Sequence, residues 1–177
     1  PGCDAPPAPL MEALASIRDR EALLPGNVQE IIIIVHPQYL NVCNIMSPET
    51  GLEAKFSYRF TAAMVMHGLD TARLENFSSS VCREPDLIKM SNKVIVKTNE
   101  RLSETAAIAT LKTFDNQVFT AEYDLTKLID PVEREEKVRS KSVSLLGQEN
   151  SDKIWNSIID EKEYGGKSVS ELLFYYS

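Results

Sequence analysis

The sequence predicts an α+β fold: a small, mostly antiparallel sheet with helices on one face, followed by C-terminal helices. The β-branched run at 28–36 predicts one strand. Three further strands are predicted at 94–98, 106–114 and 118–124, the last two joined by a tight turn. Apolar residues recur at helical spacing before and after this group of strands, which indicates helices on both sides of it in the chain.

Composition narrows the class of protein. The 177 residues suffice for one domain with a core plus an appendage, and 43% hydrophobic with 25% charged residues argues against disorder of the whole chain. The net charge of −7, without any basic run, predicts that nucleic acid is not a partner. The longest apolar run, 31–35, is far too short to cross a bilayer, so no membrane partner is expected.

Cysteine and histidine usage predicts a reducing compartment and no metal site. Cys3, Cys43 and Cys82 are odd in number and widely spaced, which is typical of reduced thiols and favours the cytoplasm. The two histidines, His36 and His67, form no ligand cluster with each other or with cysteine, and we expect both to be structural. No glycine-rich phosphate loop is present.

The first half of the chain carries clear boundary signals. Residues 1–9 are rich in proline and predict an irregular entry segment, after which residues 10–20 predict a helix. The strand at 28–36 lacks polar alternation, so we expect burial on both of its faces. Residues 115–117 predict the tight turn of a hairpin, because Asp and Asn tolerate left-handed backbone.

The C-terminal part predicts helices with much apolar surface. Asp130-Pro131 predicts a helix start, Ser151-Asp152 a second, and the capping box at 168–171 a third. We expect these helices to dock on the rest of the chain or to pair with another copy, which makes a homodimer possible. The apolar residues concerned are Ile154, Trp155, Ile158, Ile159, Leu172, Leu173 and Phe174.

One segment combines polar donors with aromatic residues. The stretch 50–60 is predicted to place Lys55, Ser57 and Arg59 on the first turns of a single helix that faces a cleft. Donors at such a position could bind a carboxylate, helped by the positive end of the helix dipole. An amphipathic helix with a charged flank explains the same residues equally well, so both interpretations stay open at this point.

The stretch Pro48–Gly68, P-x-T-G-L-E-A-K-F-S-x-x-F-x-x-A-x-x-x-x-G, resembles a signature of the MmgE/PrpD family. That family includes 2-methylcitrate dehydratases, cis-aconitate decarboxylases and an iminodisuccinate epimerase. Other family pieces follow in the expected order, so that the resemblance covers nearly the whole chain. They are Pro1-Gly2-Cys3 as the end of K-x-Y-P-x-C, the helix and strand of 10–35, Phe77, Pro85-Asp86 and Lys93-Val94.

The resemblance implies a C-terminal fragment of a longer enzyme. The architecture implied by the resemblance has a large helical domain and a smaller α+β lid domain, with the active site between them. Residues 10–128 would be the lid, and 129–177 would be C-terminal helices belonging to the larger helical domain. Most acidic and histidine groups of the family site would lie on a missing N-terminal helical domain, so the isolated fragment is expected to be inactive.

The resemblance also implies the chemistry: proton abstraction from a small di- or tricarboxylate, followed by elimination or reprotonation, without a cofactor. Lys55 and Ser57 are the best candidates for contacts to substrate or to the lid hinge, and Cys3 is a weaker one.

Two positions depart from the family pattern. Pro7 stands where a histidine is usual. Phe60 stands where a tyrosine often turns its hydroxyl to substrate, and phenylalanine cannot donate a hydrogen bond. Dehydration, decarboxylation and epimerisation therefore remain alternatives. A non-catalytic α+β ligand-binding or assembly domain is the competing hypothesis.

Overall fold

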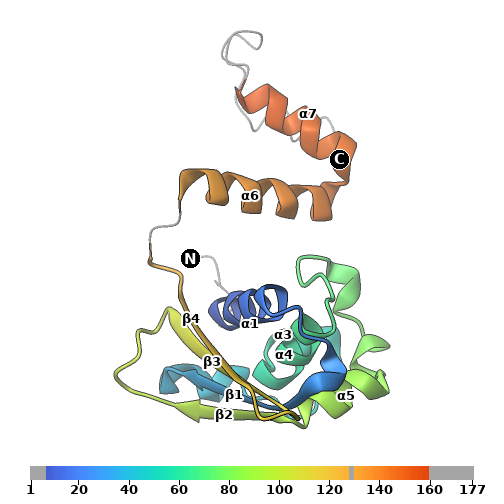
Figure 1. Ribbon diagram of the computed structural model, residues 1–177. Coiled ribbons are helices and arrows are strands. Elements are labelled where there is room, and N and C mark those ends of the chain that lie inside the picture. Colours follow the sequence, from blue (N-terminus) through green and yellow to red (C-terminus); the bar gives the residue numbers. More distant parts are fainter. Residues whose placement is uncertain (1–6, 128–129, 160–177) are drawn as a thin grey trace. The chain divides into compact units, whose positions relative to one another are not determined.

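The computed structural model describes residues 7–127 and 130–159, and the chain divides into two compact units, Pro1–Leu128 and Ile129–Ser177. The first unit contains a four-stranded sheet with helices on one face, and helices α6 and α7 lie in the second (Figure 1). The predicted α+β class is therefore confirmed. Each unit is described by itself below.

The sheet has the strand order β2-β1-β3-β4. Strand β1 is parallel to β2 and antiparallel to β3, and β3 is antiparallel to β4. The sheet is thus mostly antiparallel, as predicted, but mixed, because the connection from β1 to β2 runs through several helices and returns in the same direction. The bounds are β1 Val28–Val35, β2 Val94–Thr98, β3 Ala106–Thr113 and β4 Val118–Asp124.

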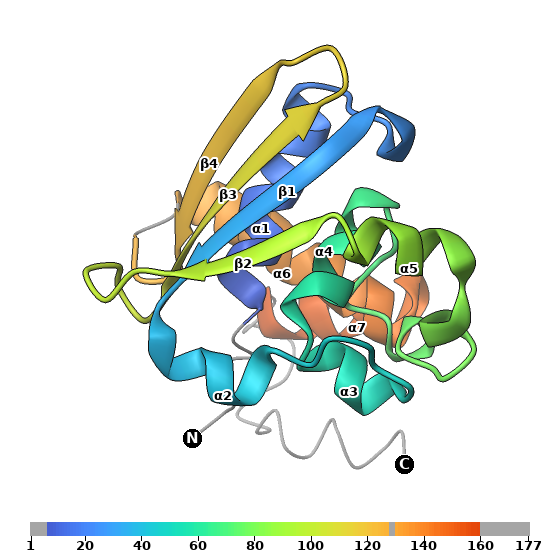
Figure 2. The same ribbon diagram turned by 90° about the horizontal axis from the view of Figure 1, so that it is seen from below.

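The prediction that β1 is buried on both faces is wrong. Ile31, Ile33 and Val35 are buried, whereas Ile32 and Ile34 between them are partly exposed. The reason is that helices of the first unit cover only one face of the sheet, as Figure 2 shows from the other side. A strand without polar alternation does not require two covered faces, since β-branched side chains also suit an open pleated surface.

Two helices provide most of the cover. Helix α1 (Ala8–Arg20) packs on β3 and β4 with Leu10, Ala13, Leu14 and Ile17, the face predicted for it. Helix α4 (Tyr58–Met66) contacts α1, β2 and α5 (Pro85–Ser91). Shorter elements connect them: α2 Leu40–Cys43, α3 Gly51–Lys55, and 3-10 turns at Pro25–Asn27, Pro37–Tyr39, Leu74–Asn76 and Val81–Arg83. Asn116 has φ 65°, as the predicted hairpin turn requires.

The prediction that residues 55–60 open a single helix is wrong, because Lys55 ends one short helix and Tyr58 begins the next, with a break at Phe56 and Ser57. Ser57 has extended backbone (φ −119°, ψ 104°) and forms an isolated bridge with Asn44. Its hydroxyl accepts a hydrogen bond from the Phe60 N–H at 3.1 Å, which caps a new helix at this point. A serine hydroxyl offers the backbone this alternative to continued helix, and the apolar spacing alone cannot reveal it.

The second unit is a helical pair, α6 (Pro131–Leu146) and α7 (Gln148–Ile159). Asp130 caps α6 by accepting from the Val132 N–H at 2.9 Å, as predicted. Helix α7 begins at Gln148, directly after Gly147 (φ 78°), so the predicted start at Ser151 is too late. Ser151 instead lies inside α7, where its hydroxyl bonds to that of Ser142 at 2.9 Å.

Some predictions fall outside the described residues. They concern Cys3 and the third C-terminal helix with Leu172, Leu173 and Phe174. Within residues 7–127 and 130–159, no helix combines the length and apolar character needed to cross a membrane.

Candidate functional site

The motif segment 48–55 is fixed by a complete capping box. The Thr50 hydroxyl accepts a hydrogen bond from the Glu53 N–H at 3.2 Å. In return, the Glu53 carboxylate accepts from the N–H groups of Glu49 at 2.7 Å and Thr50 at 3.1 Å. These backbone hydrogen bonds, that from Glu49 first, lower the pKa of Glu53. The T-G-L-E part of the motif therefore encodes the start of α3.

Gly51 serves a close approach of two backbone segments. A Cβ atom added to Gly51 would lie 1.9 Å from the carbonyl oxygen of Phe77 and 3.0 Å from the backbone nitrogen of Ser78. No side chain fits there, because the obstructing atoms are backbone. Glycine at this position thus allows the 77–78 segment to lie against the start of α3.

The side chains of the A-K-F-S part of the motif make contacts within the protein. The Ser57 side chain is fully buried, and its hydroxyl donates to the carbonyl oxygen of Ile45 at 2.6 Å while accepting from Phe60. Lys55 ends α3, with its ammonium 5.2 Å from the centre of the Phe77 ring. Arg59 donates to the backbone oxygen of Val94 and thereby ties α4 to β2.

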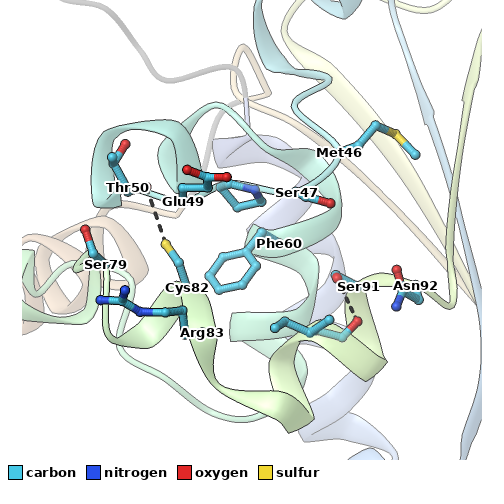
Figure 3. A pocket seen from close by; sticks show the side chains of 12 residues that line it. Met46, Ser47, Glu49, Thr50, Phe60, Ser79, Cys82, Arg83, Ser91 and Asn92 are labelled. Carbon is cyan, nitrogen blue, oxygen red and sulfur yellow. Dashed lines mark hydrogen bonds between the residues drawn. The ribbon is translucent and has the colours of Figure 1, made fainter.

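A pocket of about 570 Å³ opens beside this segment (Figure 3). Its floor includes Phe60, whose ring faces the cavity from α4. Three stretches of chain contribute the other walls: 46–50 before α3, 79–83 around the 3-10 turn Val81–Arg83, and the end of α5. The lining residues are Met46, Ser47, Pro48, Glu49, Thr50, Phe60, Ser79, Cys82, Arg83, Ile88, Ser91 and Asn92.

The pocket has one cationic side and one amide side. Arg83 extends toward Ser79 on one side, while Ser91 and Asn92 stand on the opposite side (Figure 3). Arg83 is exposed, and among the described residues its guanidinium forms no ion pair. Glu49 also lines the pocket and lies near Thr50 (Figure 3). The arrangement offers separate donors to an elongated anion.

Cys82 is part of the wall but is poorly suited to nucleophilic chemistry. The residue is 4% exposed, and its thiol donates to the Thr50 carbonyl oxygen at 3.4 Å. Burial, reinforced by the nearby charge of Glu53, raises the pKa of Cys82. The reactive thiolate is therefore disfavoured at neutral pH.

The sequence-predicted site residues do not line this pocket. Lys55 and Ser57 both lie outside the lining set, and the Ser57 hydroxyl has no further proton to donate. Cys3 lies outside the described residues, and Pro7 is buried directly before α1. Three residues named in the motif, Pro48, Thr50 and Phe60, do line the pocket, and Phe60 among them is the departure from the family pattern.

Tyr58 does not replace the tyrosine hydroxyl that Phe60 lacks. It is 1% exposed, it is absent from the pocket wall, and its hydroxyl has no hydrogen-bond partner among the described residues. Burial first, and then the neighbouring Cys43 and Tyr39, raises the pKa of Tyr58. Its hydroxyl therefore faces the protein interior and not the pocket.

Sequence reasoning missed Arg83, Ser79 and Asn92. None of these three residues belongs to a sequence pattern that marks it. The close approach at Gly51, which brings the 77–78 segment beside α3, is visible only in the structure. For metals, no group of three or more His, Cys, Asp or Glu side chains able to hold an ion occurs in the described part of the chain.

The sequence was also compared with models of known protein families. The sequence model described as the MmgE/PrpD C-terminal domain matches residues 7–157, which include the sheet, the pocket and most of α7. A search of curated proteins found no match. The family match extends over most of the 177 residues and includes the capped, glycine-dependent segment beside the pocket. The chain therefore belongs to the MmgE/PrpD family and carries its C-terminal domain.

Proposed function

We propose that residues 10–128 form the substrate-contacting lid of a lyase or isomerase that acts on a small di- or tricarboxylate. The observation that carries the proposal is the match to the MmgE/PrpD C-terminal domain, combined with a pocket beside the motif segment of that domain. MmgE/PrpD proteins are generally enzymes, such as dehydratases and epimerases. The reaction would be abstraction of a proton next to a carboxylate, followed by elimination or reprotonation.

The chemistry of the pocket supports a substrate with more than one carboxylate. Arg83 can take one carboxylate in a bidentate pair, while the amide of Asn92 can donate to a second group across the cavity. A volume of about 570 Å³ lies in the range of small-molecule sites. In this proposal Lys55 and Ser57 act as hinge and packing residues and do not contact substrate.

The proton-abstracting group is proposed to come from a separate helical domain. The described pocket contains no histidine, since His36 follows β1 and His67 follows α4. Cys82 is held as a thiol by burial. The chain by itself would therefore bind substrate without turning it over. The proposed compartment is the cytoplasm, where the thiols of Cys43 and Cys82, which form no disulfide, stay reduced.

A non-catalytic ligand-binding domain is the second candidate. Phe60 favours it, because this residue places hydrocarbon in the pocket where a family hydroxyl often stands. The two candidates differ in one respect: only the first predicts turnover once a suitable helical domain is supplied.

Grafting separates the two candidates. Residues 7–159 would replace the corresponding C-terminal region of an active MmgE/PrpD enzyme, and turnover of 2-methylcitrate or cis-aconitate would be followed. We expect no turnover by the 177-residue chain alone and measurable turnover by the chimera, increased by Phe60→Tyr. Two chimeras are compared, one with Phe60 and one with the Phe60→Tyr change. If both have native-like circular dichroism and neither is active, the lyase or isomerase proposal is contradicted.

A further inference from the structure

The face of the sheet that points away from α1 and α4 is uncovered among residues 7–127 (Figures 1 and 2). We name it the outer sheet face. Its centre is apolar or neutral, and Ile95 is 40% exposed while Ile32, Ile34 and Ile108 are partly exposed. A cluster of four isoleucines on an open sheet is a surface that would gain from being covered.

The strand register arranges this face in rows across the sheet. One row reads Lys97, Ile34, Ile108 and Glu122 from β2 to β4. The next row reads Ile95, Ile32, Thr110 and Thr120, and the two threonine hydroxyls bond each other at 3.1 Å. In the third row Glu30 on β1 lies opposite Lys112 on β3.

We propose that a second copy of this chain packs on the outer sheet face, sheet against sheet. The twofold axis would run along the strands, between β1 and β3. This rotation places β1 of one copy over β3 of the other, and β2 over β4, and each row of residues lies over the same row of the other copy. Two sheets packed in this aligned way stand about 10 Å apart and cross at about 30°.

Charge complementarity identifies the second copy as the occupant. The rotation sets Lys97 over Glu122 of the other copy, and Glu30 over Lys112, with each pair made twice. The isoleucines of the central strands then face each other or threonine. A twofold axis across the strands would instead place the Glu30 carboxylate over Ile34, which would bury a charge against hydrocarbon.

The charged groups are available for these pairs. Within the described part of the chain Glu30, Lys97 and Lys112 form no ion pair, and Glu122 has the exposed partner Lys127 at 3.1 Å. The face is small: four strands about 4.8 Å apart and about 3.3 Å per residue give a few hundred Å², below the roughly 800 Å² per partner of a stable interface. The dimer is therefore weak, reversible and dependent on concentration.

Charge reversal on the full 177-residue chain tests this interface by sedimentation velocity over a range of concentrations. In the Lys112→Glu variant, Glu30 of each copy faces a glutamate at position 112 of the other copy, so that two repulsive pairs replace two attractive ones. We expect this change to raise the dimer dissociation constant about tenfold or more. The double variant Glu30→Lys with Lys112→Glu restores both pairs and should return the constant to within about threefold of the original. Lys89→Glu, a matched charge reversal on α5, should leave it unchanged.

Folding is monitored separately, because a single reversal also places like charges on adjacent strands. Thermal unfolding of every variant is measured, and Ile34→Thr, a substitution suited to strands, serves as a second disruptive change. The proposal is overturned if the chain is monomeric at all concentrations. In that case either another segment covers the outer sheet face or nothing covers it. So does a dimer that folded Lys112→Glu and Ile34→Thr variants leave intact, since that dimer must use another surface.

Discussion

The two units of the chain differ in how they are stabilised. The first buries helix faces and alternate strand residues in one core, in which Leu10, Leu14, Ile31 and Ile33 are fully buried. Helix α6 of the second has no buried residue, and it leaves Val132, Val138, Leu145 and Leu146 between 46% and 65% exposed. Its ion pairs are local, such as Lys137 with Glu133 one turn away. The first unit is thus a domain with a core of its own. The second unit instead exposes apolar side chains that another protein domain could cover.

The largest expected difference between the units concerns matched helical leucines. Leu14→Ala should cost about 3 kcal/mol because it leaves a cavity in the core of the first unit. Leu145→Ala, 51% exposed on α6, should change the free energy of unfolding by less than about 0.5 kcal/mol. Urea unfolding followed by circular dichroism measures both. Equal losses would contradict the contrast between the units.

The second prediction concerns the close approach at Gly51. Gly51→Ala should destabilise the first unit by about 2–3 kcal/mol, because the new methyl group meets the backbone of Phe77. Gly26→Ala is the control, since nothing lies within 4 Å of a Cβ there. Differential scanning calorimetry should show a drop of several degrees for the first variant only. A Gly51→Ala protein as stable as Gly26→Ala would refute the packing of 77–78 against α3.

Ser57 distinguishes packing from substrate contact. Ser57→Ala should cost about 1–2 kcal/mol, because it removes the cap of α4 and leaves the Phe60 N–H and the Ile45 carbonyl without their partner. Ser79→Ala, in the exposed pocket wall, should leave the melting temperature unchanged. If Ser57→Ala alters ligand affinity without altering stability, the original interpretation of Ser57 as a binding residue holds.

The smallest expected effect is the pH dependence of the capping box. The pKa of Glu53 is lowered from its ordinary value of 4.5, so its stabilising contribution is present above pH 4.5 and is lost as the pH falls through the lowered pKa. Glu53→Gln keeps an amide oxygen for the cap but does not titrate. Thermal melts below pH 4.5 should therefore fall less steeply for the variant. Parallel curves for both proteins would contradict this role.

The sequence predicted elements that depend on local signals. The α1 face, the strands, the Asn116 turn and the Asp130 cap follow from spacing and residue type, and the structure agrees. The break at Ser57 was missed because the apolar spacing of Phe56, Phe60 and Met64 continues across it. The open outer face of β1 was missed because strand composition does not report what covers each side.

The pocket was harder to predict than the fold, and the reason is topological. Motif residues such as Lys55 and Ser57 attract attention by type, yet the cavity beside them is completed by Arg83 and Asn92 from a segment about thirty residues further along. Tertiary contacts bring these stretches together, such as the close approach at Gly51 and the hydrogen bond from the Cys82 thiol to the Thr50 carbonyl oxygen. Of the residues in the motif block, Phe60 was the one whose type and position both pointed to the site.

The most direct test of the account is a titration of the 177-residue chain with cis-aconitate, followed by amide chemical shifts in NMR. The account predicts saturable shifts at 46–50, 79–83 and 91–92, their loss in Arg83→Gln, and their persistence in the matched surface variant Lys89→Gln. Acetate, with one carboxylate, should bind more weakly. Shifts that are absent, that map away from the pocket, or that survive Arg83→Gln unchanged would contradict the proposed carboxylate site.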